Sequence, residues 1–198
     1  MQEFVLATAN RGKLLEFSAL LGPRGLRLRA QSEFGVSSAE ETGLTFIENA
    51  IIKARHAASA TGMPALADDS GLAVDALGGE PGIRSARFAG PGADDAANNR
   101  ALLARLAGVP ASERVARFHC VLVLMRHAGD PVPLVCSASW EGRILEAPRG
   151  EHGFGYDPLF LDTALGRSAA ELEPALKNRV SHRARAMQAL LQALGPRC

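Results

Sequence analysis

The beginning of the chain contains the pattern that most restricts its fold. A short apolar run at residues 4–8 is followed by a helical pattern at 14–21 and by an alternating run at 26–31. Gly22 and Pro23 end the predicted helix before the second run. Two strands joined through a helix within about 30 residues form a parallel pair. We therefore expect an α/β fold.

The second half of the chain predicts antiparallel strands in the same sheet. Residues 114–127 and 133–140 are apolar runs separated by an Ala-Gly-Asp-Pro turn, and the second run continues to residue 145. A hairpin beside a parallel pair makes the sheet mixed. Because the chain shows no internal repeat or linker, we expect one domain over residues 1–198. Segments with helical periodicity that flank this sheet are residues 45–58, 94–108 and 182–194.

The helix expected at 45–58 has a clear start signal. Thr45-x-x-Glu48 forms a capping box. In a capping box the Thr45 side chain accepts the backbone N–H of Glu48, and the Glu48 side chain accepts the backbone N–H of Thr45. The residues expected to face inward from this helix are Ile47, Ile51, Ala54 and Ala58. A polar stripe of Asn49 and Lys53 is expected on the opposite side.

Composition and charge exclude several classes of protein. With 22% charged residues and a formal net charge of +1, the chain lacks a general electrostatic attraction for nucleic acid. Its 3 cysteines lie far apart, which argues against a disulfide framework and favours a reducing compartment. No segment approaches the ~18 apolar residues of a membrane span, and the start of the chain lacks the features of a signal peptide. We therefore expect a cytoplasmic protein that binds neither nucleic acid nor a membrane.

The turn between the first strand and the first helix has the residues of an anion site. Thr8, Asn10 and Lys13 surround the start of the helix, where free backbone N–H groups favour an anion. The lysine adds a point charge for phosphate. This is not a P-loop, because Ala7 stands where the first glycine belongs and Leu14 follows the lysine. The alternative is a capped helix with a solvated lysine.

The second candidate set consists of the acidic residues Glu40, Glu41, Asp68, Asp69 and Asp75. Magnesium binds hard oxygen ligands and needs only one or two protein carboxylates beside substrate phosphates. Asp68 and Asp69 end an apolar run, and we expect the chain to turn at residues 70–71, directly after them. On an extended segment their side chains point to opposite faces. The alternative is that the glutamates are solvated, that Asp68 caps the turn and that Asp75 is structural.

Two later segments supply further candidates. In GFGYDP, residues 153–158, glycines let the backbone approach a ligand and the aromatic rings can stack on a nucleobase. His182 and Arg183 stand at a predicted helix start, where cations are unfavourable unless a ligand or an acid holds them. The alternatives are an aromatic core anchor for the first segment and ordinary surface polarity for the second.

One kind of ligand satisfies all four sets, namely a nucleotide with a polyphosphate tail. At this point the sequence also resembles the inosine triphosphate pyrophosphatases, or Ham1-like family, over nearly the whole chain. The motifs that carry the resemblance are TANRGK at 8–13, EETGLTFIENAIIKA at 40–54, ADDSGLAVDALGGEPGIRSAR at 67–87, GFGYDP at 153–158 and KNRVSHR at 177–183.

The resemblance implies an elongated mixed β-sheet flanked by helices, with two lobes around a central nucleotide-binding cleft, in a homodimer. It implies Mg²⁺-dependent hydrolysis of the deaminated purine nucleotides ITP, dITP and XTP to the monophosphate and pyrophosphate. A pyrophosphatase for another modified nucleotide and a sensor that binds without turnover are the alternatives.

The resemblance also implies residue roles. Asp69 would bind magnesium and accept a proton from the attacking water, with Lys13 and Lys53 as further catalytic residues. Glu41 would be the second metal ligand, with Glu40 as a neighbouring candidate. Ala9 and Arg84 depart from the glycine and the aromatic residue that are usual in the family at these positions. The residues implied to contact the substrate are Thr8, Ala9, Asn10, Arg11, Gly12, Lys13, Ser70, Phe154, Gly155, Tyr156, Asp157, Lys177, His182 and Arg183.

Overall fold

The computed structural model describes residues 2–8 and 10–195, and its strands form a seven-stranded sheet in the order β2-β1-β3-β4-β5-β6-β7. The strands are β1 (Gln2–Leu6), β2 (Leu26–Ala30), β3 (Ala65–Val74), β4 (Val115–Met125), β5 (Leu134–Ile144), β6 (Phe160–Asp162) and β7 (Arg167–Ser168). The α-helices are α1 (Arg11–Leu21), α2 (Phe46–Thr61), α3 (Asp95–Arg105), α4 (Pro174–Val180) and α5 (His182–Leu194). Because β1 pairs in parallel with β2 and β3 while β6 pairs antiparallel with β5, the sheet is mixed. The predicted α/β class, with helices flanking a mixed sheet, is confirmed.

The described residues group into two compact units. Unit 1 is made of the described residues within Met1–Asp69, Cys120–Ala138 and Arg183–Cys198. Unit 2 is made of Ser70–His119 and Ser139–His182. The chain therefore passes from one unit to the other within β3, β4 and β5 and at the start of α5.

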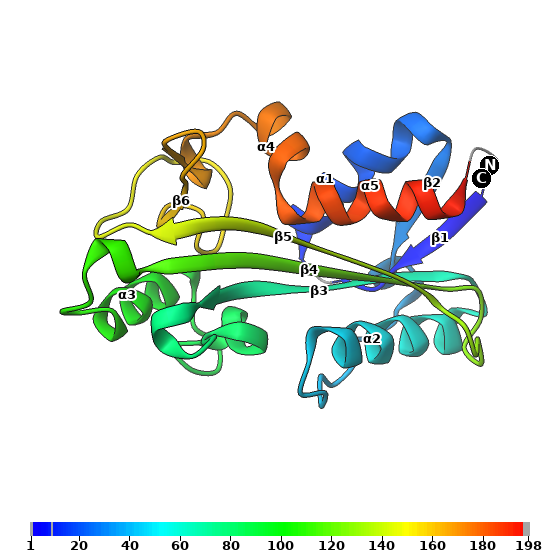
Figure 1. Ribbon diagram of the computed structural model, residues 1–198. Helices are drawn as coiled ribbons and strands as arrows, with labels where there is room; N and C mark the ends of the chain where they lie inside the picture. Colours follow the sequence, from blue (N-terminus) through cyan, green and yellow to red (C-terminus); the bar gives the residue numbers. More distant parts are fainter. Residues whose placement is uncertain (1, 9, 196–198) are drawn as a thin grey trace. The chain divides into compact units, whose positions relative to one another are not determined.

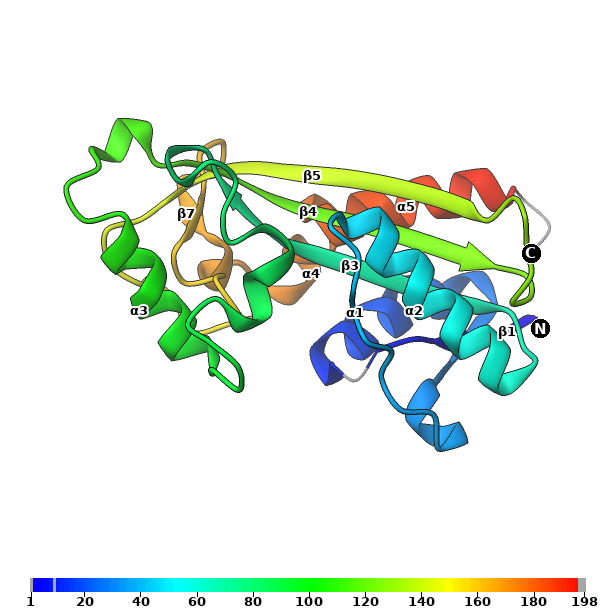
Figure 2. The same cartoon turned by 90° about the horizontal axis from the view of Figure 1, so that it is seen from below.

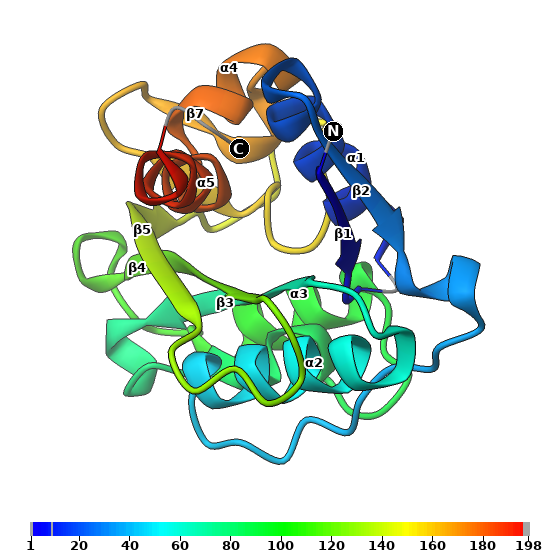
Figure 3. The same ribbon diagram turned by 90° about the vertical axis from the view of Figure 1, so that its right-hand side faces the viewer.

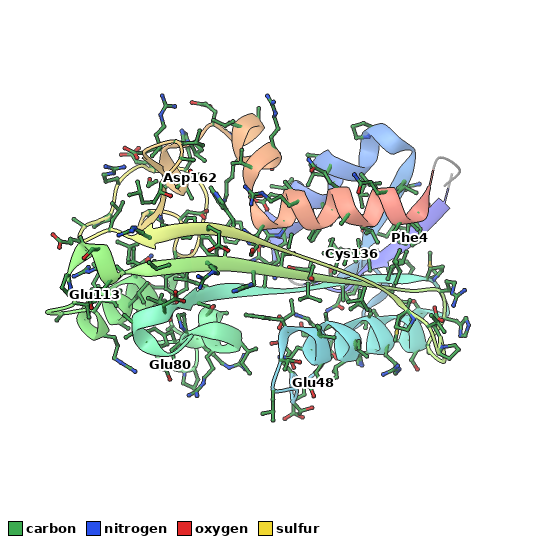
Figure 4. The ribbon with its side chains drawn as sticks, viewed as in Figure 1. Phe4, Glu48, Glu80, Glu113, Cys136 and Asp162 are labelled. Carbon is green, nitrogen blue, oxygen red and sulfur yellow. The ribbon has the colours of Figure 1, made fainter. Side chains whose placement is uncertain are left out.

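In unit 1, helices cover both faces of the strands, with α2 on one face and α1 and α5 on the other (Figures 1 and 3). Alternate strand residues face the two helical layers, as the two-residue period of a strand requires. Phe4 and Leu6 of β1 pack with α1 and α5, whereas Val5 packs with the alanines of α2. Figure 4 labels Phe4 and Cys136, both of which belong to the α1 and α5 layer.

Unit 2 has a core of its own, built mainly from aromatic and aliphatic side chains of β3, β4, β5, β6 and α3. Trp140 of β5 is fully buried there, and its indole N–H donates to the Asp162 carboxylate at 2.8 Å. The other oxygen of Asp162, labelled in Figure 4, accepts the backbone N–H groups of residues 164 and 165. Because Asp162 satisfies these donors, the short β6–β7 connection is fixed to the core of unit 2.

Helix α2 begins as predicted, but its buried face differs from the predicted one. The Thr45 hydroxyl accepts the Glu48 N–H, and the Glu48 carboxylate accepts the Thr45 N–H, which is the expected capping box. Figure 4 labels Glu48 at the start of α2. Ile47, however, is 45% exposed, whereas Asn49 is fully buried. The side-chain oxygen of the buried Asn49 accepts the N–H of Gly43 at 2.8 Å. Figure 2 shows α2 in front of the unit 1 strands. Its buried stripe consists of Ala50, Ala54, Ala57 and Ala58.

Strand β3 is longer than predicted, and two short strands were not predicted. The chain does not turn at residues 70–71, because β3 runs without interruption from Ala65 to Val74. The predicted 114–127 and 133–145 hairpin is confirmed as the neighbouring strands β4 and β5. Ser168 caps a single 3₁₀ turn, Ala169–Glu171.

Candidate functional site

Asp68 and Asp69 lie next to each other in β3, within unit 1, and their side chains reach different helical layers. Leu66 packs in the α1 and α5 layer, whereas Ala65 and Ala67 pack in the α2 layer. Asp68 therefore continues the alternation on the first face and Asp69 on the second. Both are buried. The sequence prediction that the two acids point to opposite faces is confirmed by their partners.

Asp68 is held by cations of α1 and α5. The Lys13 Nζ atom lies 2.7 Å from Asp68 Oδ2, and the Arg183 Nε atom lies 4.0 Å from the same oxygen. Burial by itself would raise the pKa of Asp68, but the positive charges of Lys13 and Arg183 outweigh burial and hold this pKa well below its usual range. Asp68 is therefore an ionised carboxylate whose charge is balanced within unit 1.

Arg183, a predicted substrate contact, is almost completely buried in unit 1. Its guanidinium forms an ion pair with Glu16 of α1 and lies 5.8 Å from the centre of the Phe17 ring. Burial opposes its charge, but Asp68 and Glu16 more than compensate, so the pKa of Arg183 is raised. Sequence reasoning missed Glu16, although an acid three residues after Lys13 in an otherwise apolar helix segment was a signal.

Asp69 forms the centre of a second cluster on the α2 face. Lys53 Nζ lies 2.7 Å from Asp69 Oδ1 and 3.1 Å from Glu41 Oε1, so one ammonium joins two carboxylates from separate segments. Burial raises the pKa of Asp69 more than the charge of Lys53 lowers it. Burial would lower the pKa of Lys53, but its acidic neighbours outweigh burial and raise it. The cluster thus keeps a protonated lysine between two acids.

The second oxygen of Asp69 lacks a hydrogen-bond donor among the described residues. Asp69 Oδ2 is buried, and none of the residues that the structure describes donates a hydrogen bond to it. A buried carboxylate oxygen without a donor is expensive unless a water, a cation or a ligand contacts it. This atom is therefore a candidate contact for a metal ion or for the attacking water.

The donor set around Asp69 fits magnesium bound together with phosphate. Across residues 2–8 and 10–195, no group of three or more His, Cys, Asp or Glu side chains is arranged to hold a metal ion. Glu41 and Asp69 offer two carboxylates, which matches the one or two that Mg²⁺ takes when phosphates and waters complete its shell. Glu40 is exposed, and no described contact brings it into this cluster.

The segment that carries Glu41 is fixed by the first turn of α2. One Glu48 oxygen accepts the N–H groups of Leu44 and Thr45, each at 2.8 Å, and Asn49 accepts that of Gly43. A Cβ atom on Gly43 would lie 2.5 Å from Glu48 Cβ, so the loop packs directly on the helix. The capping box therefore also positions the neighbouring metal-ligand candidate.

The predicted anion turn is present at the start of α1. Asn10 caps the helix by accepting the Lys13 N–H at 3.1 Å, and the Thr8 hydroxyl accepts the Asn10 N–H at 3.1 Å. The first turn of α1, which contains Gly12, has no acidic residue to repel an anion. Ala9 lies outside the described residues, as does the side chain of Arg11. The backbone thus offers an anion position beside Lys13 and Asp68.

The predicted purine-binding residues of unit 2 form a separate cluster around Asp157. Asp157 Oδ2 accepts the Phe154 N–H at 2.8 Å and lies 2.6 Å from Lys177 Nζ. Lys177 also lies 5.1 Å from the centre of the Phe154 ring. Phe154 remains half-buried, so an ordered aromatic side chain and a lysine lie next to each other.

Two other predicted residues of unit 2 contact its core. Tyr156 is buried, and its hydroxyl donates to the Ser85 carbonyl at 2.8 Å, which supports the core-anchor alternative for this ring. Burial raises the pKa of its hydroxyl. His182 stacks on Phe118 with ring centres 4.8 Å apart. Ser70 is half-buried in β3, directly after Asp69.

Taken together, the mixed α/β sheet and the acid–lysine clusters on its β3 strand define a protein suited to binding a polyanionic ligand with a divalent cation. The Ham1 family model matches residues 4–193 of this chain. The chain belongs to the Ham1 family.

Individual relatives cover almost the whole chain. The dITP/XTP pyrophosphatase of Yersinia pseudotuberculosis is 61% identical over 194 residues, which cover 98% of both chains. The dITP/XTP pyrophosphatase of Vibrio parahaemolyticus is 59% identical and covers 98% of this chain and 97% of its own. The solved structure of a HAM1 protein from Coxiella burnetii is 50% identical, with a TM-score of 0.91 and 98% coverage of both chains.

None of the helices among the described residues is both long enough and apolar enough to cross a membrane.

Proposed function

We propose that this protein hydrolyses the deaminated purine nucleotides ITP, dITP and XTP to the nucleoside monophosphate and pyrophosphate. The observation that carries the proposal is the cluster of Glu41, Lys53 and Asp69, in which one buried oxygen of Asp69 has no donor among the described residues. The family membership and relatives called dITP/XTP pyrophosphatases support the same conclusion.

The residues of unit 1 bind the phosphates in this proposal. Thr8, Asn10 and the first turn of α1 offer N–H groups to the chain of phosphates, and Lys13 and Lys53 neutralise its charge. Glu41 and Asp69 would hold magnesium, which supplies Lewis-acid polarisation of the phosphate oxygens when it is bound. The loss of Lys13 or Lys53 would therefore weaken both substrate binding and stabilisation of the leaving group.

Asp69 accepts the proton of the attacking water. Its buried carboxylate has a raised pKa, which makes it a stronger base than an exposed aspartate. The water oxygen bonds to the α-phosphorus while the bond from this phosphorus to the bridging oxygen breaks. Pyrophosphate leaves with the electron pair, and the proton that Asp69 takes up is later released to solvent. Positioning and charge neutralisation supply most of the rate enhancement.

The residues of unit 2 read the base in this proposal. The predicted contacts in unit 2 are Ser70, Phe154, Gly155, Tyr156, Asp157, Lys177 and His182. Arg183 of unit 1 is a further predicted substrate contact, and its guanidinium is paired with Glu16. A deaminated purine offers an oxygen acceptor at position 6, whereas adenine offers an amino donor. A donor such as Arg183, His182 or a loop N–H group pairs with the first and is left unpaired by the second, which disfavours adenine.

The test is pyrophosphate release from ITP, dITP, XTP, ATP and GTP in the presence of magnesium. We expect kcat/KM for ITP to exceed that for ATP about tenfold or more, because one unpaired buried donor opposes ATP. A different preferred nucleotide would favour the modified-nucleotide alternative. Tight binding of ITP without pyrophosphate release would favour the sensor.

Magnesium dependence is tested with two neighbouring acids. Glu41→Gln should raise the magnesium concentration needed for half-maximal activity about tenfold or more, because a carboxylate ligand is lost. Glu40→Gln removes the same charge one residue away and should leave this concentration unchanged. Equal effects of the two variants would contradict the assignment of Glu41.

We also propose that the protein works in the cytoplasm, as its cysteine content predicted, and that it is a homodimer, as the resemblance implied. Light scattering during size-exclusion chromatography measures the mass directly, and a value near the 20.8 kDa of one chain would contradict the dimer.

A further inference from the structure

Helix α3 of unit 2 holds a single glycine of the 153–157 loop by both of its backbone polar groups. The Gly155 N–H donates to Asp95 Oδ2 at 2.6 Å, and the Gly155 carbonyl accepts from Asn99 Nδ2 at 2.8 Å. Asp95 and Asn99 are four residues apart, so they lie on one face of α3. The orientation of the backbone on either side of Gly155 is therefore fixed from one helix.

The conformation of Gly155 shows why this attachment matters. Its φ is +62°, a left-handed backbone that most residues avoid, yet a Cβ atom would meet nothing within 4 Å. The constraint at this position is thus conformational and not steric. Because the flanking residues are Phe154 and Tyr156, the direction of the Gly155 peptide groups sets where both aromatic rings are placed.

A second set of bonds from α3 supports the same loop. Asn98 donates to the Ala86 carbonyl at 3.2 Å and accepts the Ala89 N–H at 2.9 Å, which ties α3 to the 3₁₀ segment Gly82–Arg87. That segment supplies the Ser85 carbonyl to which the Tyr156 hydroxyl donates. Helix α3 therefore restrains the loop directly at Gly155 and indirectly at Tyr156.

Asp95 is not needed to cap its own helix. The cap is Asp94, whose side chain accepts the Ala97 N–H at 2.7 Å. Asp95 is also exposed. Its short hydrogen bond to Gly155 therefore has no explanation in the local stability of α3, and it connects two segments 60 residues apart.

We infer that Asp95 and Asn99 are positioning residues for base recognition. They act through the 153–157 loop, which they hold so that Phe154 and the Asp157–Lys177 pair present one fixed surface to the purine. This inference rests on the proposed function, because it assumes that this loop contacts the base.

The test compares Asp95→Ala, Asp95→Asn and Asn99→Ala with a matched control, Asp94→Asn. The control removes the same charge from the same helix end, and asparagine is an equally good cap. Three quantities are measured: kcat and KM for ITP, the ratio of kcat/KM for ITP to that for ATP, and inhibition by inorganic tripolyphosphate, which has no base.

We expect Asp95→Ala to lower kcat/KM for ITP about tenfold, mainly through KM, and to reduce the ITP to ATP ratio, because a charge-assisted hydrogen bond is lost. Asp95→Asn should restore most of this loss, since its amide oxygen can accept the same N–H. Asn99→Ala should have a smaller effect, about threefold. Tripolyphosphate inhibition should stay within about twofold for every variant. The control should match the wild type.

Hydrogen exchange of residues 153–157 provides a readout that does not depend on the reaction. Exchange should accelerate in Asp95→Ala and Asn99→Ala but not in Asp94→Asn. Unchanged exchange would overturn the attachment itself, and faster exchange with an unchanged ITP to ATP ratio would overturn its role in specificity. If the wild type showed no preference for a deaminated purine, the proposed function would fail, whereas the exchange result would still report on the attachment.

Discussion

Two adjacent aspartates of β3 differ completely in their surroundings. Asp68 is paired with Lys13 and lies near Arg183, and the positive charges of these two residues hold its pKa below the usual range. Asp69 shares Lys53 with Glu41 and keeps one oxygen without a donor among the described residues. The carboxylate with the lowered pKa contributes its charge to the stability of the fold, whereas the one with the raised pKa is suited to accepting a proton.

This difference predicts opposite results for the same substitution at neighbouring positions. Asp69→Asn should lower kcat at least about 100-fold, because the proton acceptor is lost, while thermal unfolding changes little. Asp68→Asn should instead reduce the free energy of unfolding by about 3 kcal/mol, since it leaves Lys13 without its acid and removes one of the two acids beside the buried Arg183. Kinetics and urea unfolding of both variants check this. Comparable loss of stability in the two variants would contradict the division of roles.

At the level of elements, the loop before α2 depends on a glycine for steric reasons. A Cβ atom on Gly43 would lie 2.5 Å from Glu48 Cβ and 3.0 Å from the Asn49 nitrogen. Gly43→Ala should therefore displace the Glu41 segment, lower the free energy of unfolding by about 1–3 kcal/mol and reduce kcat/KM.

Gly129→Ala is the matched control for this substitution. A Cβ atom at Gly129 would meet only the His127 ring, at 3.8 Å, which is an ordinary contact. Urea unfolding and steady-state kinetics should show no comparable change in this variant. If Gly43→Ala behaved like the control, the capping box would not position Glu41.

The connection between β4 and β5 predicts a dependence of stability on pH. Asp130 accepts bonds from the Arg126 side chain and from the backbone N–H groups of Arg126 and Val132, and these bonds hold its pKa below the usual range. A carboxylate with a lowered folded pKa stabilises the protein above its unfolded pKa of about 3.9, and this contribution is lost as the pH falls below that value.

The measurement compares urea unfolding of the wild type and Asp130→Asn between pH 7 and pH 3. The wild type should be more stable at pH 7, and the difference should shrink as the pH falls below about 4. A difference that stays constant over this range would show that Asp130 contributes through shape and not through its charge.

The elements that the sequence predicted well are those with a strong periodic pattern, such as the β1–α1–β2 unit and the β4–β5 hairpin. Strands β6 and β7 have 3 and 2 residues, which is too short for any period to be visible. β3 was expected to end at Asp69 because two charges, a serine and a glycine suggest a turn, but ion pairs with Lys13 and Lys53 make the charges compatible with a buried strand.

Some residues of the candidate site could be predicted from local motifs, whereas others are brought together only by folding. Motif residues such as Lys13, Lys53 and Asp69 were predicted, and they do form ion pairs in unit 1. The Glu16–Arg183 pair was not predicted, because its members are separated by 167 residues and no local pattern joins them. The hydrogen bonds from α3 to Gly155 were missed for the same reason.

At the scale of the whole molecule, metal removal should affect activity and stability differently. Lys53 already balances Glu41 and Asp69 without a divalent ion. We therefore expect a chelator to abolish pyrophosphate release while the Tm falls by only a few degrees, and we expect magnesium with ITP to raise the Tm through binding. Calorimetry with and without EDTA checks this. Global unfolding on chelation would mean that the ion is structural.

Because side chains alternate between the two faces of β3, a shift of the strand by one residue would move every side chain to the opposite face. Inserting or deleting one residue before Asp68 would send each acid to the helix that now serves the other, whereas a change of two residues would preserve the faces. Homologous chains that vary in length should therefore accommodate their insertions outside Ala65–Asp69, and the adjoining loops are where such variation would be harmless.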